Sequence, residues 1–280
     1  MHKGVIDIPW GYLFTGYFLM IIPLLIFRYY RTGLERSTLW ALLRMTVQLL
    51  LVGLYLEYIF RWDNKWLNIL WVLIMTVVAS YTVIKRTGLR LRKFFFTVLA
   101  ATVLSIVLID YYFLGFVIGL KNILTARYFI PITGMLLGNS LKNVIIALDA
   151  YYKRIDEEEV SYRWQLADGA THSEALLPFM RHALRRAFNP LIATTAVMGL
   201  ISLPGMMTGQ ILGGSDPMVA VKYQIMILVV IFASTSLNVW LTIIFSNRIA
   251  FDPFLNLRKD IFASDSNSFQ HKKTKRNKIS

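Results

Sequence analysis

The chain has 280 residues, of which 56% are hydrophobic and only 16% are charged. Soluble domains carry about a quarter of charged residues, so this composition excludes a water-soluble globule and predicts an all-α, polytopic bundle of transmembrane helices. The formal net charge of +14 does not indicate a nucleic-acid partner, because the Lys and Arg residues lie between apolar stretches and in the tail instead of forming a separate basic domain. The chain contains no cysteine, which excludes thiolate metal sites.

Seven apolar stretches are long enough to cross a hydrocarbon core of about 30 Å as helices. The first begins and ends with aromatic residues, as helices do at a membrane interface, and Pro23 predicts a kink within it. The predicted spans cover about residues 10–30, 39–60, 66–84, 94–116, 128–147, 191–207 and 221–245.

The basic residues between these spans predict the orientation of the chain. Of the Lys and Arg residues between the spans, at their ends or in the tail, 22 fall on one side of the membrane and six on the other. This bias predicts that the N-terminus lies outside and the C-terminus in the cytoplasm, in an integral protein of the cell membrane. We place the transmembrane permease domain at 1–251 and a basic cytoplasmic tail at 252–280. The tail has few apolar residues, especially after Ala263, so we expect it to be disordered and to touch anionic lipid headgroups.

The fifth span combines helix-breaking and polar residues at membrane depth. Gly134 and Gly138 form a small-xxx-small pair, which lets another helix approach closely. Four polar side chains within one turn would make a poor lipid-facing surface. They predict either a translocation path or a hydrogen-bonded packing seam between helices. The residues of interest here are Pro131, Gly134, Gly138, Asn139, Ser140, Lys142 and Asn143.

A second stretch in which Gly and Pro should interrupt the helix lies at the end of the sixth span, in the sequence LPGMMTGQILGGSDP at 203–217. Non-helical backbone at membrane depth is tolerated only where it is buried in protein or lines a cavity. The apolar residues between its glycines therefore favour a re-entrant or half-helical element at the outer mouth of a path, with an ordinary outer loop as the alternative. Its candidate path residues are Pro204, Gly205, Met206, Met207, Gly209 and Gln210.

The longest cytoplasmic segment, about 150–188, contains an amphipathic helix. From His172 to Phe188 apolar residues recur at helical spacing, while three arginines lie off that stripe. Thr171 or Ser173 is positioned to cap the helix. Such a helix either lies on the membrane surface or docks on a cytoplasmic partner through its apolar face.

Several kinds of site are missing from the sequence. No GxxxxGK[ST] motif is present, so the chain does not bind ATP through a P-loop. All four histidines lie outside the spans, which argues against an imidazole metal site in the membrane. Asp110 is near the end of the fourth span and is followed by two tyrosines, as expected for an interfacial position. No nucleophile and base stand together, so we do not expect an enzyme.

Three motifs together resemble the Fet-type iron-export ABC permease family, which includes plant proteins linked to aluminium tolerance. They are PITGMLLGNSLKN, ADGATHSEALLPFMRHALRRAFNP and LPGMMTGQILGGSDPMVAVKYQI, and the resemblance reaches to about Phe251. It implies a pair of permease chains that work with a separate cytoplasmic ABC ATPase. ATP and Mg would be bound by that partner, and no cofactor by this chain.

The resemblance also implies roles for particular residues. Gly169, Ala170, Glu174 and Ala175 correspond to the element through which such permeases contact their ATPase, and the two Gly-rich stretches become candidates for the translocation path. Iron(II) favours carboxylate and imidazole ligands, which the spans hardly offer, so no metal ligands are assigned and an organic or chelated substrate stays open. A stand-alone channel or secondary carrier is the alternative function, although a carrier would need a deeply placed coupling acid.

Overall fold

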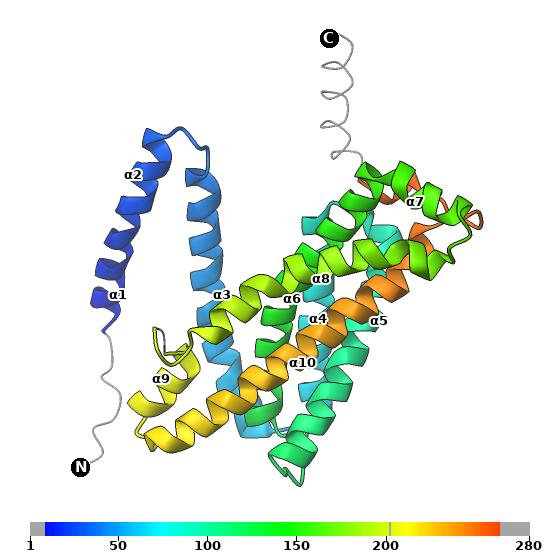
Figure 1. The fold of residues 1–280 in the computed structure, drawn as a ribbon. Coiled ribbons are helices and arrows are strands. Elements are labelled where there is room, and N and C mark those ends of the chain that lie inside the picture. The colour runs from blue at the N-terminus through cyan, green and yellow to red at the C-terminus, as the bar shows by residue number, and fades with distance from the viewer. Residues whose placement is uncertain (1–8, 202, 264–280) are drawn as a thin grey trace. The chain divides into compact units, whose positions relative to one another are not determined.

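The computed structural model describes residues 9–201 and 203–263, and over these ranges the chain is built of helices without an extended β-strand (Figure 1). The predicted all-α fold class is confirmed. Six helices in the described ranges are long and apolar enough to cross a membrane. They are Gly11–Tyr29, Glu35–Trp62, Lys65–Thr87, Leu91–Val117, Ala126–Glu157 and Pro217–Ala250.

One of two compact units comprises Met1–Asn64 and Gly205–Val221. A short 3-10 turn, η1, joins α1 to α2 just before Pro23, which has no amide hydrogen to continue the α-helical pattern. The hydroxyls of Tyr17 and Thr46 are hydrogen-bonded, which holds the first helical segment against α3. The helices of this unit are α1 (Trp10–Tyr17), η1 (Phe18–Met20), α2 (Ile21–Tyr29), α3 (Glu35–Trp62) and α9 (Gly205–Leu212).

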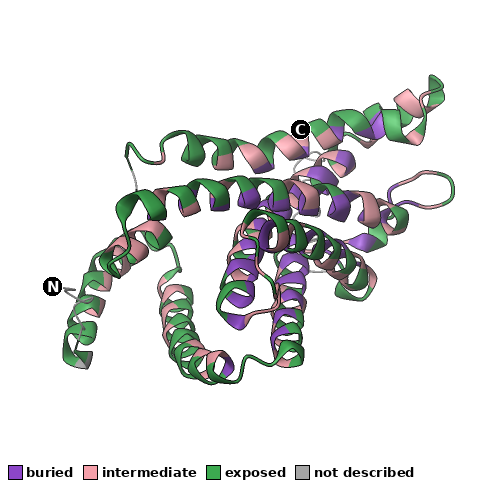
Figure 2. Ribbon diagram, turned by 90° about the horizontal axis from the view of Figure 1, so that it is seen from below, coloured by how far each residue is buried: buried purple, intermediate pink, exposed green. Residues whose placement is uncertain are grey.

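The other unit comprises Lys65–Pro204 and Lys222–Ser280. Its central helix α6 packs against α4 and α8, and α4 also packs against α5. Most buried positions lie on helix faces turned toward neighbouring helices (Figure 2). The elements are α4 (Lys65–Thr87), α5 (Leu91–Asp110), a π-helical segment η2 (Tyr111–Val117), α6 (Ala126–Glu157), α7 (Glu159–Ala167), α8 (His172–Ala196), most of α10 (Pro217–Ala250) and η3 (Lys259–Ile261).

A large apolar core joins the ends of these helices near α7 and α8. Phe94 of α5, Tyr152 of α6 and Phe179 of α8 are almost completely buried in it. The same cluster includes residues from the ends of α4 and α10 and from the segment after α10. Because burial of each large apolar side chain stabilises the fold by about 1.5–3 kcal/mol, this core fixes α7 and α8 firmly to the membrane helices.

The structure differs from the sequence prediction at the sixth span. A single helix over 191–207 is not formed, because α8 ends at Ala196 and α9 begins at Gly205. Gly199 in the intervening turn adopts a left-handed φ of 84°, a conformation in which helices commonly end. Near its middle, α8 contacts α10, where the rings of Phe188 and Phe232 lie 5.6 Å apart. The count of seven spans and the orientation of the termini stay predictions.

The segment 252–263, which the sequence assigned to the basic tail, lies on the helices. The amide of Arg90 donates a 2.8 Å hydrogen bond to the carbonyl of Ile261, and Ile261 is itself fully buried. Packed structure therefore continues beyond the domain boundary that we placed at residue 251. The segment 264–280, where disorder is predicted, lies outside the described residues.

Candidate functional site

The four predicted coupling residues lie together at the junction between α7 and α8. Gly169 adopts a left-handed φ of 93° just after α7, which lets the chain reverse direction before α8 begins. Gly169 and Glu174 are exposed and Ala170 is half-buried, so these three are accessible to a partner. Ala175 is completely buried in the apolar core. It therefore belongs to the support of the junction and not to its outer surface.

Glu174 also starts helix α8 through a capping box. Its carboxylate accepts hydrogen bonds from the amide of Thr171 at 2.8 Å and from the hydroxyl of Thr171 at 2.7 Å. The hydroxyl of Thr171 in turn accepts from the amide of Glu174 at 3.4 Å. These bonds satisfy groups that a helix start otherwise leaves unpaired, and they hold the pKa of Glu174 below its usual value. Of the two predicted caps, Thr171 is the one used.

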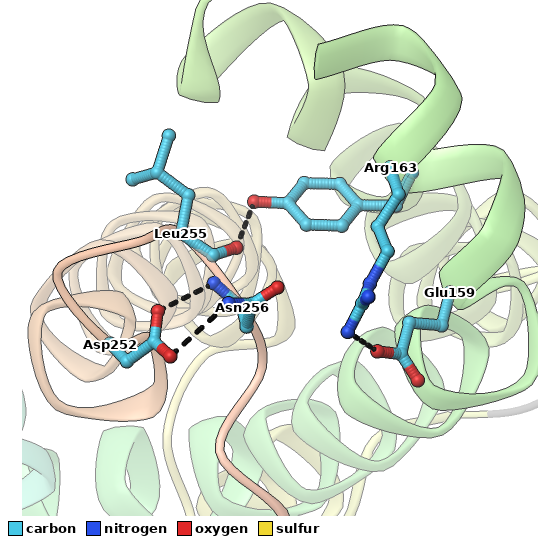
Figure 3. Close-up of polar contacts among 6 residues, drawn as sticks. Glu159, Arg163, Asp252, Leu255 and Asn256 are labelled. Atoms are coloured by element: carbon cyan, nitrogen blue, oxygen red, sulfur yellow. Dashed lines mark hydrogen bonds and ion pairs between the residues drawn. The ribbon is translucent and has the colours of Figure 1, made fainter. Parts of the chain in front are cut away.

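Tyr162 connects α7, α8 and the segment after α10. Its hydroxyl donates to the carbonyl of Leu255 at 2.8 Å (Figure 3). The same hydroxyl lies 2.9 Å from Nδ1 of His172. Burial, with a contribution from the negative charge of Asp252, raises the pKa of Tyr162 to about 12, so the hydroxyl keeps its proton at neutral pH. A hydroxyl has one proton to donate. His172 must therefore donate from Nδ1, and burial lowers the pKa of this imidazole and favours its neutral form.

A tight loop after α10 presents the carbonyl that Tyr162 binds. The carboxylate of Asp252 accepts from the amide of Asn256 at 2.8 Å and from the Asn256 side chain at 3.3 Å (Figure 3). It also accepts from the amide of Phe254 at 2.9 Å. These bonds lower the pKa of Asp252. They hold Leu255 at a left-handed φ of 62°, a conformation that costs free energy for a residue other than glycine.

The sequence analysis missed both Tyr162 and this loop. A signal for the loop is present, because an Asp followed by Pro and then Asn, as in DPFLN, is typical of turns in which the aspartate binds backbone amides. The partner of Tyr162 lies far along the chain and has no local signature. An exposed ion pair, Arg163 with Glu159 at 2.5 Å, lies on α7 near this loop (Figure 3) and contributes little to stability.

The polar residues of α6 divide into two groups. Ser140 is buried, and its hydroxyl lies 3.4 Å from that of Thr235 on α10. The side-chain amides of Asn139 and Asn143 instead donate to carbonyls of α6 itself, those of Met135 at 2.9 Å and of Asn139 at 3.3 Å. Ser140 thus lies in a polar seam between α6 and α10, and its place in a translocation path stays a prediction. Asn139 is half-buried, and its place in a translocation path stays a prediction.

The same seam continues between α5 and α10. Thr102 donates to the side-chain oxygen of Asn238 at 3.3 Å, and Ser105 donates to the carbonyl of Ser234 at 3.0 Å. Thr242 also donates to Asn238, at 3.2 Å. The sequence analysis did not single out α10, although Ser234, Asn238 and Thr242 are four residues apart and so share one helix face.

The two glycines of the predicted close-approach pair have different surroundings. A Cβ atom added to Gly134 would lie 2.8 Å from Cε of Met75 on α4, whereas nothing lies within 4 Å of a Cβ added to Gly138. Only Gly134 therefore marks a close approach between helices in this unit. Pro131 is exposed, close to the start of α6.

The second Gly-rich stretch forms the short helix α9, which contains five of its six candidate path residues, Gly205, Met206, Met207, Gly209 and Gln210. Pro204 directly precedes it. The side-chain oxygen of Gln210 is buried and has no hydrogen-bond partner among the described residues. An eight-residue helix agrees with the expected half-helical element. Because α9 and α6 belong to different units, a path that includes both stays a prediction.

Asp110 is buried between helices, which the sequence analysis did not predict, and its interfacial depth stays a prediction. It is 2% exposed, and its Oδ2 accepts a 2.5 Å hydrogen bond from Thr133 of α6. Its Oδ1 has no partner among the described residues. Asp110 lines a cavity of about 420 Å³ whose other walls come from α4, α5, α6 and the segment that follows η2. No cluster of three or more possible metal-ligating His, Asp or Glu side chains occurs within 9–201 and 203–263.

Comparison with known proteins identifies the family. Residues 10–251 match the family described as "Uncharacterised protein family (UPF0014)". The chain belongs to this family. The UPF0014 membrane protein YjkA of Bacillus subtilis is 34% identical over 220 residues, covering 78% of this chain and 86% of that protein. No solved structure matches the chain.

Two other relatives confirm the resemblance found in the sequence motifs. The "Probable iron export permease protein FetB" of Escherichia coli is 32% identical over 220 residues, covering 79% of this chain and 83% of that protein. The "Protein ALUMINUM SENSITIVE 3" of Arabidopsis thaliana is 32% identical over 201 residues, covering 70% of each chain. Together with the six apolar helices, these relatives identify an integral membrane protein of the cell membrane and of a permease family.

Proposed function

We propose that this chain is the membrane-spanning permease subunit of an ABC exporter. A separate ATPase subunit binds Mg and ATP, and two permease chains assemble with two ATPases. The observation that carries the proposal is the α7–α8 junction, an exposed turn at Gly169 and Ala170 seated on a rigid apolar core. The printed name of the FetB relative supports export by a permease.

The junction is positioned to pass a displacement caused by a bound partner on to the membrane helices. A partner that contacts Gly169, Ala170 or Glu174 would act on Ala175, which is buried one residue further along α8. The core around Ala175 contains residues of α4, α5, α6 and α10, all of which are candidate spans in whole or in part. Packed cores deform little, so displacement of the junction would move the ends of several spans together.

The cargo class is proposed in two forms. Iron or another metal ion follows from the name of the FetB relative. An organic substrate is favoured by one structural observation, the almost entirely apolar cavity beside Asp110. The translocation path is proposed to run past Asn139 of α6.

Copurification tests the proposal. The tagged chain is solubilised in a mild detergent, and the recovered complex is assayed for ATP hydrolysis with and without candidate metal ions. We expect an ATPase to copurify, and Glu174→Arg to uncouple transport from ATP hydrolysis. Glu57→Arg is the matched control, since it makes the same substitution at a glutamate that is 71% exposed on α3. Absence of any ATPase under gentle conditions would favour a stand-alone channel or carrier.

A further inference from the structure

One side of α5 carries a buried acid that has no positively charged partner among its described contacts. Asp110 accepts one hydrogen bond, from Thr133, and its second oxygen is buried and unpaired among the described residues. Burial of a carboxylate without a compensating charge is costly, and acids at membrane depth usually serve a ligand, an ion or a proton. The π-helical segment η2 starts at the next residue, and such segments are frequent at functional sites.

The cavity beside this acid is apolar apart from Asp110 and two hydroxyl-bearing residues. Its walls include Val72 of α4, Ile106 of α5 and Phe129 of α6, all of them buried. The hydroxyl of Thr76, also in the wall, is already bonded to the carbonyl of Val72 at 2.8 Å. Asp110 is thus the one ionisable group among the lining residues that could fix a ligand by charge.

The rim of the cavity is on the outer surface of the unit. Leu73, Val107 and Tyr111 line the cavity and are 47%, 58% and 59% exposed, respectively. All three belong to candidate membrane spans. A ligand can therefore enter sideways from the hydrocarbon region, which requires a molecule that dissolves in lipid.

We propose that this cavity binds a lipophilic organic cation. Its positive centre pairs with the Asp110 carboxylate, and its hydrocarbon body packs against Val72, Ile106 and Phe129. The volume of about 420 Å³ falls in the range of small-molecule sites, which combine apolar walls with a few polar groups. The aromatic ring of Tyr111 at the rim offers a further favourable contact to a cation.

The donor set does not suit a bare metal ion. Iron(II) and similar ions require several oxygen or nitrogen ligands. The lining of this cavity offers the carboxylate of Asp110, the phenol of Tyr111 and the hydroxyl of Thr76, which is already bonded to Val72. A lipid acyl chain would fit the walls but would leave the carboxylate unpaired. The inference rests on the proposed permease function in one respect. It assigns this cavity as the binding site of the transported substrate, which is then an organic cation and not a metal ion.

Binding of tetraphenylphosphonium tests the inference. The full chain is purified, reconstituted in nanodiscs of neutral lipid, and measured by equilibrium dialysis with empty nanodiscs subtracted. We expect saturable binding that Asp110→Asn weakens by at least about tenfold, the effect of losing one charge pairing in an apolar site. Asp149→Asn is the matched control, since that acid is 39% exposed and paired with Lys153. The neutral analogue triphenylphosphine oxide should bind weakly and equally to the wild type and to Asp110→Asn.

A second variant covers the case in which Asp110→Asn does not fold. Val107→Trp should obstruct the rim while leaving the Asp110–Thr133 bond intact, and it should also abolish binding. Equal binding of the cation by the wild type and Asp110→Asn would overturn the inference, as would displacement of the cation by stoichiometric Fe²⁺. ATPase copurification without cation binding refutes this site alone. Cation binding without any ATPase refutes the proposed permease function and leaves the site standing.

Discussion

The hydroxyl of Tyr162 donates a 2.8 Å hydrogen bond to the carbonyl of Leu255, a residue 93 positions further along the chain. This bond ties α7 to the loop that follows α10. Leu255 occupies a left-handed conformation that the Asp252 carboxylate maintains. The aromatic ring of Tyr162 also packs against Phe179 of α8 and against Phe251. The candidate coupling junction is thus held by a contact between segments far apart in the sequence.

Tyr162→Phe should loosen the junction without emptying the core. The ring is kept, but the Leu255 carbonyl and His172 both lose a partner, so we expect the free energy of unfolding to fall by about 1–3 kcal/mol. The melting temperature in detergent measures this loss. Val160→Ala, on an exposed position of the same helix, is the control and should have little effect. Equal melting temperatures for Tyr162→Phe and the wild type would mean that the bond does not stabilise the fold.

Acidification should weaken the same region. The folded pKa of His172 is lowered by burial, so the unfolded chain binds more protons below pH about 6.5. Its contribution to stability is complete above that pH and is lost as pH falls through the folded pKa. We expect the melting temperature to decrease between pH 7.5 and 5.5.

His172→Phe should make this decrease smaller, because phenylalanine keeps the ring against Phe251 but cannot be protonated. A remaining decrease is expected from His182, whose pKa is also lowered, mainly by desolvation and then by the positive charges of Arg154 and Arg186. An identical pH dependence in His172→Phe and the wild type would contradict the role assigned to this imidazole.

Glu174 can be tested for its two roles separately. Glu174→Gln keeps a side chain that can complete the capping box but removes the charge. Thr171→Ala removes the cap and keeps the charge. If the carboxylate contacts the ATPase, Glu174→Gln should lower substrate-stimulated ATP hydrolysis more than Thr171→Ala does, although Thr171→Ala should lower the melting temperature more. The reverse order for ATP hydrolysis would show that Glu174 acts only by starting α8.

Much of α8 was predictable because its information is local. Apolar residues at helical spacing predicted the buried positions Ala175, Phe179 and Ala183, and the Thr171 cap was one of two predicted. The helix continues past Phe188 to Ala196 and includes Pro190. That extension was not predicted, since proline more often ends a helix.

Other features depend on contacts that a local pattern does not contain. The Thr133 hydroxyl that donates to Asp110 lies on another helix, so the sequence showed only an acid next to tyrosines. Hydropathy predicted a span over 191–207 because the average over the window is apolar. Hydropathy does not report backbone conformation, and the left-handed φ of Gly199 is incompatible with a continuous helix through this stretch. The α6 glycine pair shows the same limit, since spacing cannot tell which of two glycines faces a neighbouring helix.

Gly134 and Gly138 allow the same substitution to be tested at two positions with different expected results. In a helix, alanine is more favourable than glycine by about 1 kcal/mol, and Gly138 has open space for a methyl group. Gly138→Ala should therefore raise the melting temperature slightly. Gly134→Ala must displace the end of the Met75 side chain, which lies 2.8 Å from the added carbon. It should gain less or lose stability, and Gly134→Leu should lose clearly more than Gly138→Leu.

Transport assays of the same variants separate packing from passage. If Gly138 borders the path next to Asn139, Gly138→Leu should slow transport while the melting temperature and the copurified ATPase stay unchanged. Slow transport together with a lowered melting temperature would instead place Gly138 in a helix interface, formed with a second chain or with the other unit. Gly134→Leu combined with Met75→Ala provides the internal check. The smaller side chain on α4 should restore part of the lost stability, because it removes the contact that makes the substitution costly.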